Sequence, residues 1–465
     1  MDFVIVLGAL VFLMVVAYRG YSVILFAPIA AMGAVLLTDP SLVAPMFTGL
    51  FMDKMVGFLK LYFPVFLLGA VFGKLIEISG FSKSIVAATI RLFGPKQALM
   101  SIVVVCALLT YGGVSLFVVV FAVYPFAAEL FRQGDIPKRL IPGTIALGAF
   151  TFTMMALPGT PQIQNIIPTA FFGTDSWAAP VLGTLGSVLI FATGMLYLEW
   201  RRRAAAAAGE GYGVDLRNEP EPFIGDRLAH PLVALLPLLL VGIANKVFTM
   251  AIPQLYGSSH AFPSSAMQDA VPVVQEISRV AAIWAVQGAL LVGIVAVLVL
   301  AWRPVRAKFA EGSRTAVAGA LLASMNTASE YGFGAVIAAL PGFLLVANSL
   351  NSIPDPLVNE AVTVTALAGI TGSASGGMSI ALAAMAESFI ANAQAAGIPM
   401  EVLHRVAAMA SGGMDTLPHN GAVITLLAVT GLTHRQSYKD IFAITLISTA
   451  AVFAVIALHY LTGWV

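Results

Sequence analysis

Long apolar stretches recur from one end of this sequence to the other, and no other feature constrains the fold as strongly. A helix that crosses the hydrocarbon core of a bilayer needs about 20 predominantly apolar residues. Only 10% of the 465 residues are charged and 59% are hydrophobic, whereas an average soluble domain carries roughly 25% charged residues. We therefore predict an all-α polytopic membrane protein. Ten predicted spans lie near residues 3–18, 20–37, 58–79, 140–172, 179–199, 230–249, 280–302, 314–345, 402–433 and 439–462.

Basic residues indicate which ends of the spans face the cytoplasm, because cytoplasmic loops carry an excess of Lys and Arg. Arg201, Arg202 and Arg203 make the central polar loop cytoplasmic. If the spans alternate outward from this loop, most other basic residues fall on the same side, including those of the loop expected at 303–314. Both termini then lie outside. Arg405 is one of the few basic residues that this alternation places outside.

Two further apolar stretches, 97–131 and 357–395, are each too long for one helix and carry a Gly- and Ser-rich break in the middle. Each must enter and leave the membrane on the same side, since a single crossing would move every later basic loop to the opposite side. The charge pattern does not distinguish two crossing helices from a re-entrant hairpin. The chemistry of the breaks favours the hairpin.

Three short segments occur in the same order and at similar spacing in both halves of the chain. They are Thr110–Ser115, Ile136–Pro137 and Leu157–Pro161 in the first half, and Ser375–Ser379, Ile398–Pro399 and Leu417–Gly421 in the second. We predict two inverted repeats of five spans, 1–200 and 230–465, joined by a cytoplasmic linker at 201–229. Each repeat has one re-entrant hairpin and one discontinuous helix, at 140–172 and 402–433. Because five is odd, the first hairpin opens to the cytoplasm and the second to the outside, a design typical of secondary transporters.

The two hairpin tips and the two helix interruptions form the predicted binding site. A helix that stops inside the membrane leaves backbone groups unpaired, which is tolerated only beside protein or a water-filled cavity. Helix N-termini there favour an anion such as a carboxylate, and Ser and Thr hydroxyls suit a hydroxylated substrate. The candidate substrate-binding residues are Thr110, Gly112, Gly113, Ser115, Gly159, Thr160, Gln162, Gln164, Asn165, Thr371, Ser373, Ser375, Gly377, Ser379, Thr416, His419 and Asn420. Gln162, Gln164 and Asn165 could instead make hydrogen bonds between helices.

Three ionisable residues within the predicted spans are candidates for carrying a coupling proton. They are Asp415, His419 and Glu330, since ionisable residues at membrane depth often belong to proton relays. Asp415 and His419 lie four residues apart around Pro418 and could instead brace the kink. Sodium could also bind the carbonyl groups freed at the breaks, so sodium coupling stays an open alternative.

Other classes of function receive less support from the sequence. We expect no cofactor, no metal site and no catalytic residue, because no second histidine joins His419 and Asp415 at ligand spacing. An intramembrane enzyme and an anion channel are therefore the alternatives from other classes. Nucleic-acid binding has no support, since the net charge is +1 and no basic stripe is present.

With these segments identified, the chain resembles the gluconate permease family of the ion transporter superfamily. The residues that carry the resemblance are Gly73–Phe81, Tyr111–Ser115 and Leu417–Gly421. The resemblance implies proton-coupled import of a small organic carboxylate across the bacterial inner membrane. It also implies a homodimer with a scaffold domain and a moving transport domain of elevator type.

The first tip departs from what a sugar-acid transporter would need. Val114, Leu116 and Phe117 make it apolar, which suits a smaller or less hydroxylated acid. We therefore expect a short-chain hydroxy acid such as 3-hydroxybutyrate, ahead of a sugar acid such as gluconate.

Overall fold

The computed structural model describes residues 2–19, 21–94, 97–214, 216–220, 228–263, 272–343, 353–418 and 420–465, and these are almost entirely helical. The first half contains α1 (Asp2–Tyr18), α2 (Val23–Thr38), α3 (Val43–Met46), α4 (Met52–Ile78), α5 (Phe81–Phe93), α6 (Ala98–Tyr111), α7 (Leu116–Gln133), α8 (Ile141–Ala149), α9 (Phe152–Met155), α10 (Ile163–Phe172) and α11 (Pro180–Ala207). The second contains α12 (Pro231–Tyr256), α13 (Ala281–Leu300), α14 (Trp302–Ala339), α16 (Pro356–Thr371), α17 (Ala374–Ala395), α18 (Met400–Ser411), α19 (Gly421–Thr430) and α20 (His434–Thr462). A small antiparallel hairpin of β1 (Ser259–Phe262) and β2 (Val273–Glu276) lies between α12 and α13.

Six helical stretches of the described chain are long and apolar enough to cross a membrane. They are Pro40–Ile78, Pro180–Ala207, Pro231–Tyr256, Ala281–Leu300, Ala374–Ala395 and His434–Thr462. The prediction of a helical protein with several apolar spans is thus confirmed. The stretch Ala374–Ala395 is α17, which belongs to a segment expected to be re-entrant. Its length alone would also permit a crossing.

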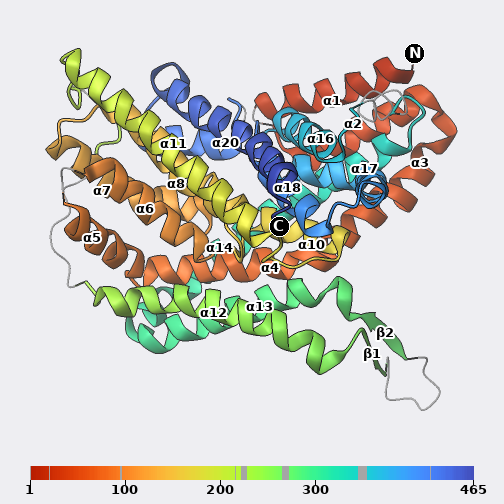
Figure 1. The fold of residues 1–465 in the computed structure, drawn as a ribbon, viewed down its shortest axis with the longest axis horizontal. Helices are drawn as coiled ribbons and strands as arrows, with labels where there is room; N and C mark the ends of the chain where they lie inside the picture. The colour runs from red at the N-terminus through yellow and green to blue at the C-terminus, as the bar shows by residue number, and fades with distance from the viewer. Residues whose placement is uncertain are drawn as a thin grey trace.

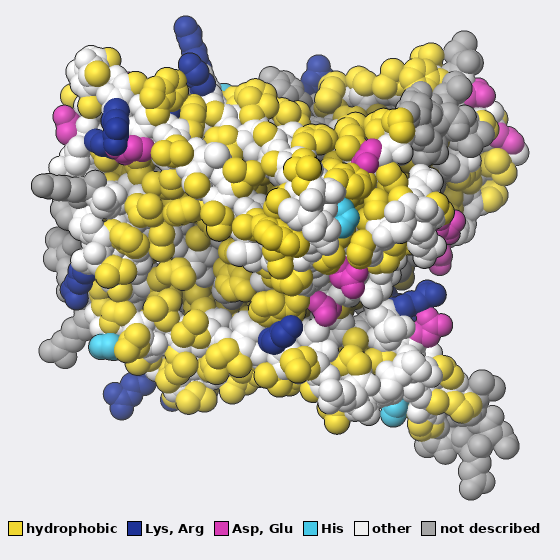
Figure 2. Space-filling view, in the orientation of Figure 1, with side chains coloured by type: hydrophobic (Ala, Val, Ile, Leu, Met, Phe, Trp, Pro, Cys, Tyr) yellow, Lys and Arg dark blue, Asp and Glu magenta, His cyan; other side chains and the backbone are white. Residues whose placement is uncertain are grey.

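The outer surface matches a lipid environment. Hydrophobic side chains cover much of the face in Figure 2, with few charged side chains among them. On α12 the exposed residues Leu232, Leu236, Leu239 and Ile243 recur every three or four positions, which is the spacing of one helix face. A continuous apolar face of this kind would be unfavourable in water and is suited to contact with lipid.

The helices form two groups. The long helices α4 and α14 pack along each other, with α13 against α4 and α2 against α14. Figure 1 shows α12 and α13 as a layer on one side of α4, with the remaining helices on the other side. In the second group, the α6–α7 hairpin packs on α8, and the α16–α17 hairpin packs on α18.

Two stretches expected to be loops are helical. Arg303, Arg306, Lys308 and Arg314 lie inside α14, which begins at Trp302, because this segment is rich in good helix formers. The predicted 201–229 linker begins with Arg201–Arg203 still inside α11, which continues through an alanine run to Ala207.

The described part of the linker is also tied to the rest of the protein. The Glu219 carboxylate pairs with Lys138 and Arg132, at 2.6 Å in each case. Burial alone raises the pKa of Glu219, but these two cations outweigh burial and hold the pKa below its ordinary value. Glu210 pairs with Arg139 at 2.6 Å. Ion pairs therefore connect the described part of the linker to the end of α7 and to the residues that follow it.

Candidate functional site

Both helix interruptions lie where proline and glycine stop the helix. α9 ends at Met155, and Pro158, Gly159 and Pro161 follow before α10 begins. Gly159 has a φ of +79°, a left-handed conformation that glycine adopts without strain. In the second half, α18 ends before Gly412, and α19 begins after Asn420, whose side-chain oxygen accepts a hydrogen bond from the Val423 N–H at 2.8 Å. We call these interruptions break 1 (156–162) and break 2 (412–420).

Side-chain amides join each break to the tip of the hairpin in the same half. The Gln162 amide donates to the Thr110 carbonyl at 2.7 Å and to the Val114 carbonyl at 3.2 Å. The Asn420 amide donates to the Gly372 carbonyl at 2.9 Å. The Thr110 carbonyl also accepts a hydrogen bond from the Gly113 N–H at 3.0 Å. In each half, the break and the hairpin tip are therefore in direct contact.

The two breaks also meet each other. A side chain on Gly412 would overlap the sulfur of Met155, so break 2 lies directly against the start of break 1. Asn165 of α10 connects break 1 with α18, the helix that precedes break 2: its amide donates to the Thr160 carbonyl at 3.0 Å, and its oxygen accepts from Arg405 at 3.0 Å. All four predicted site segments thus form one connected region.

Arg405 was not among the candidate site residues, yet it lies beside them in the structure. It is fully buried in α18. Its guanidinium donates to the Met155 carbonyl at 3.0 Å and to the Ala178 carbonyl at 2.6 Å, besides Asn165. All its hydrogen-bond partners in the described chain are neutral oxygens. The Asp175 carboxylate lies near enough to interact with this charge electrostatically, without a hydrogen bond to it. An arginine only a few residues before a predicted interruption was the available signal.

Several predicted binding residues carry buried polar atoms that have no hydrogen-bond partner among the residues that the structure describes. The hydroxyl groups of Thr110, Thr160 and Ser379 are among them, as is the side-chain carbonyl of Gln164. Buried polar groups in folded proteins are nearly always hydrogen-bonded. Orphaned groups at the tips and breaks therefore have free hydrogen-bonding capacity that a ligand could use.

Of the buried carboxyl groups in the described second half, Asp440 is paired with Arg139 and Arg201, whereas three others are not fully hydrogen-bonded within the described chain. Glu330, Glu360 and Asp415 each have at least one carboxyl oxygen without a partner, and Glu360 has two. The Glu330 carboxyl group lies against Gly376, in the first turn of α17, where any side chain would overlap it. Glu360 was not among the predicted residues, although an acidic residue within the apolar 357–395 stretch was a visible signal.

The other predicted residues have local structural partners. Gly112 and Gly113 let the first tip pack closely against Leu238 and Leu290, and Gly377 lets the second hairpin close against Ala368. The Thr371 hydroxyl donates to the Leu367 carbonyl at 3.0 Å, and the Ser373 hydroxyl caps α17. The Ser375 hydroxyl lies 3.2 Å from the Thr327 hydroxyl. The Thr416 hydroxyl contacts the Thr445 hydroxyl. Ser115 immediately precedes α7 without a side-chain capping bond. His419 lies outside the described residues.

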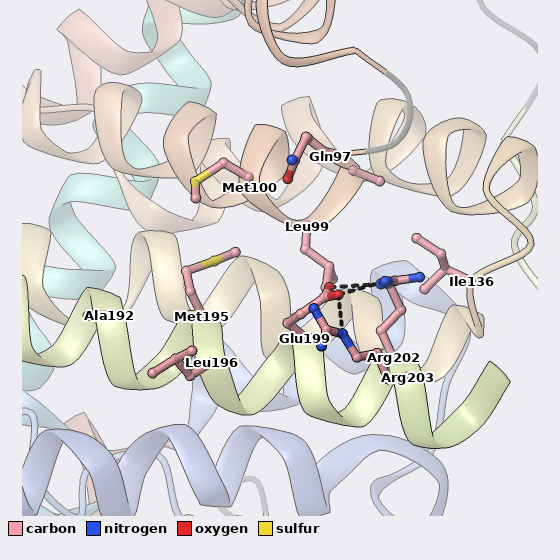
Figure 3. Close-up of a pocket in the computed structure, with 11 residues that line it drawn as sticks. Gln97, Leu99, Met100, Ile136, Ala192, Met195, Leu196, Glu199, Arg202 and Arg203 are labelled. Atoms are coloured by element: carbon pink, nitrogen blue, oxygen red, sulfur yellow. Dashed lines mark hydrogen bonds and ion pairs between the residues drawn. The ribbon is translucent and has the colours of Figure 1, made fainter. Parts of the chain in front are cut away.

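Figure 3 shows a cavity between α6 and α11. None of its lining residues belongs to the tips or breaks. This cavity is therefore separate from the candidate site.

Comparison with known proteins supports a transport role. No protein-family model matches the chain. The chain is 60% identical over 474 residues to a protein of Bacillus subtilis (strain 168) named "Uncharacterized transporter YxjC", with both sequences covered completely. Its fold is similar to the crystal structure of the Alcanivorax borkumensis YdaH transporter, with a TM-score of 0.51 and 14% identity over 92% of this chain and 90% of that one. The chain therefore belongs to the family of the transporter YxjC, and it is a multi-pass membrane transporter.

Proposed function

We propose that the protein is a proton-coupled symporter that imports a small organic carboxylate. The observation that carries this proposal is the set of buried, unpartnered polar atoms at the tips and breaks, on Thr110, Thr160, Gln164, Ser379 and Asp415. A substrate with a carboxylate and a hydroxyl group would supply the missing hydrogen bonds.

The charge of the site favours an anionic substrate. Arg405 holds a buried positive charge beside break 1, and α10 and α19 begin at the breaks, so their N-termini add partial positive charge. The unpartnered groups are few, and Val114 at the first tip is fully buried and apolar. A short-chain hydroxy acid such as 3-hydroxybutyrate fits this composition better than a sugar acid such as gluconate, which carries more hydroxyl groups.

The buried carboxyl groups favour proton coupling. An ionised carboxylate without a donor or a cation is costly in an apolar interior. Glu330, Glu360 and Asp415 are therefore suited to take up a proton in one state and release it in another. Glu330 and Asp415 lie at the second tip and at break 2, and His419 is the neighbouring candidate from the sequence. A site that releases a proton only after the substrate has left would couple the two movements.

Equivalent packing in the two halves supports an inverted repeat. α7 packs on α19 of the other half, and α17 correspondingly packs on α10. If α2 is equivalent to α13, and α4 to α14, then the contact of α2 with α14 corresponds to the contact of α13 with α4. We assign α1, α2, α4 and α12–α14 to a scaffold, and the two hairpins with α8–α11 and α18–α20 to a transport domain that moves as an elevator. The protein would act as a homodimer in the bacterial inner membrane, with the 201–229 segment in the cytoplasm.

A ligand screen on purified protein tests the substrate class. Ligand binding to the folded state raises the apparent melting temperature, so short hydroxy acids should raise it more than gluconate or neutral analogues. The Thr160→Val and Ser379→Val variants should lose this shift. Stabilisation by uncharged analogues, or shifts unchanged in both variants, would contradict the assignment of the site.

Transport assays separate the proposal from its alternatives. Uptake that requires a sodium gradient would replace proton coupling by sodium coupling, with sodium held by carbonyl groups at the breaks. Uptake that does not saturate would indicate an anion channel. Chemical conversion of the ligand by the purified protein would indicate an intramembrane enzyme.

A further inference from the structure

The cavity between α6 and α11 has a volume of about 550 Å³ and is open on one side. The start of α6 forms one wall and the second half of α11 forms the other, with Ile136 at one end (Figure 3). Its lining residues are Gln97, Ala98, Leu99, Met100, Ile136, Ala192, Met195, Leu196, Glu199, Arg202 and Arg203.

One end of the cavity is basic. The Glu199 carboxylate lies between two guanidinium groups, with Arg202 at 2.6 Å and Arg203 at 2.9 Å (Figure 3). Two guanidinium groups against one carboxylate leave a surplus positive charge. Arg203 is the more available, because its side chain is 75% exposed and contacts Glu199 through Nε alone. Trp200 beside them is 60% exposed, as expected for a residue at the membrane–water interface.

The other end of the cavity is apolar. Ala192, Met195 and Leu196 line it on α11, and Met100 of α6 lies opposite Met195 (Figure 3). The rise from Ala192 to Arg203 is about 16 Å at 1.5 Å per residue. The cavity therefore passes from an apolar end, deeper in the span, to a basic end where the span gives way to Arg201–Arg203. This is the polarity of a phospholipid seated beside a transmembrane helix.

We propose that this cavity binds an anionic phospholipid. The phosphate group would lie at Arg202 and Arg203, and an acyl chain would lie along Met195, Leu196 and Met100. Charge complementarity selects an anionic headgroup, because basic residues at the cytoplasmic ends of spans attract anionic lipids. A lipid in this position contacts both α6 and α11, so it stabilises the first hairpin against its neighbouring span.

The test uses the full-length protein in detergent, with added phosphatidylglycerol or phosphatidylcholine. Native mass spectrometry and thermal unfolding should detect retained phosphatidylglycerol and a raised melting temperature, and phosphatidylcholine should give neither. Arg203→Gln should weaken phosphatidylglycerol binding roughly fivefold, and the Arg202→Gln and Arg203→Gln double variant roughly 25-fold, since each basic residue near the surface contributes about 1 kcal/mol. Arg306→Gln, an exposed arginine of α14, is the matched control and should bind as wild type.

Two further experiments distinguish a lipid from free phosphate and test the contribution of the apolar end. Inorganic phosphate alone should not raise the melting temperature, because it lacks the acyl chain. An equal effect of free phosphate would replace the lipid by a simple anion and overturn the proposal. Ala192→Trp places a ring in the apolar end and should weaken lipid binding without removing charge. Equal binding of both lipids, or unchanged binding in Arg203→Gln and Ala192→Trp, would also refute it.

Discussion

The close approach of α14 and α17 provides a sharp test of the fold. A Cβ added at Gly334 of α14 would lie 2.8 Å from the Cα of Ile380, a backbone atom of α17. Ordinary Cβ contacts begin near 3.4 Å, so the two helices must separate by at least the difference, 3.4 − 2.8 = 0.6 Å. Extra atoms in a well-packed interior cost about 1–3 kcal/mol. Replacement of glycine by alanine inside a helix recovers about 1 kcal/mol.

A control in the same helix isolates the packing cost. Gly319 also lies in α14, and nothing lies within 4 Å of a Cβ added there. Gly319→Ala should therefore melt at or above the wild-type temperature, and Gly334→Ala should melt below both, in thermal unfolding of detergent-purified protein. Transport should fall in Gly334→Ala alone, because α14 and α17 belong to the proposed scaffold and transport domains. Equal melting temperatures for the two variants would refute the close packing of α14 on α17.

Further predictions concern single side chains of the candidate site. Arg405→Gln should strongly lower the melting temperature, because the Met155 and Ala178 carbonyls lose their donors at about 1–3 kcal/mol each; wild-type stability would contradict this. Thr160→Val should keep or raise stability, since its hydroxyl has no partner to lose, while raising the KM for uptake; an unchanged KM would exclude substrate contact. Glu360→Gln should fold normally but lose the pH dependence of uptake if Glu360 carries the proton, and an unchanged pH profile would leave Glu360 a purely structural group.

The membrane class and the places where the helices break followed from local sequence. Apolar length predicted the spans, and Pro158 and Pro418 with their neighbouring glycines predicted the interruptions, because these residues act on their own backbone. The same local reasoning explains one error. The charged residues after Trp302 suggested a loop, but charge does not stop a helix made of good helix formers.

The contacts inside the site did not follow from local sequence. Arg405 reaches carbonyl groups more than 200 residues away in the chain, and no spacing pattern encodes such a partner. Gln162 and Asn165 were predicted as substrate ligands or helix-to-helix donors. Their amide N–H groups donate to backbone carbonyl groups of the tip and of break 1 in this structure. Sequence alone does not indicate which hydroxyl groups lack a hydrogen-bond partner, because this depends on neighbours that are distant in the chain.

The central claim is that movement of a carboxylate substrate is coupled to movement of a proton. The most direct measurement uses proteoliposomes that contain the purified protein, a pH-sensitive dye inside, and equal sodium on both sides. Addition of 3-hydroxybutyrate outside should acidify the interior, and an inward proton gradient alone should drive its accumulation above the outside concentration. Accumulation driven only by a sodium gradient, or substrate entry without any proton movement, would contradict the account.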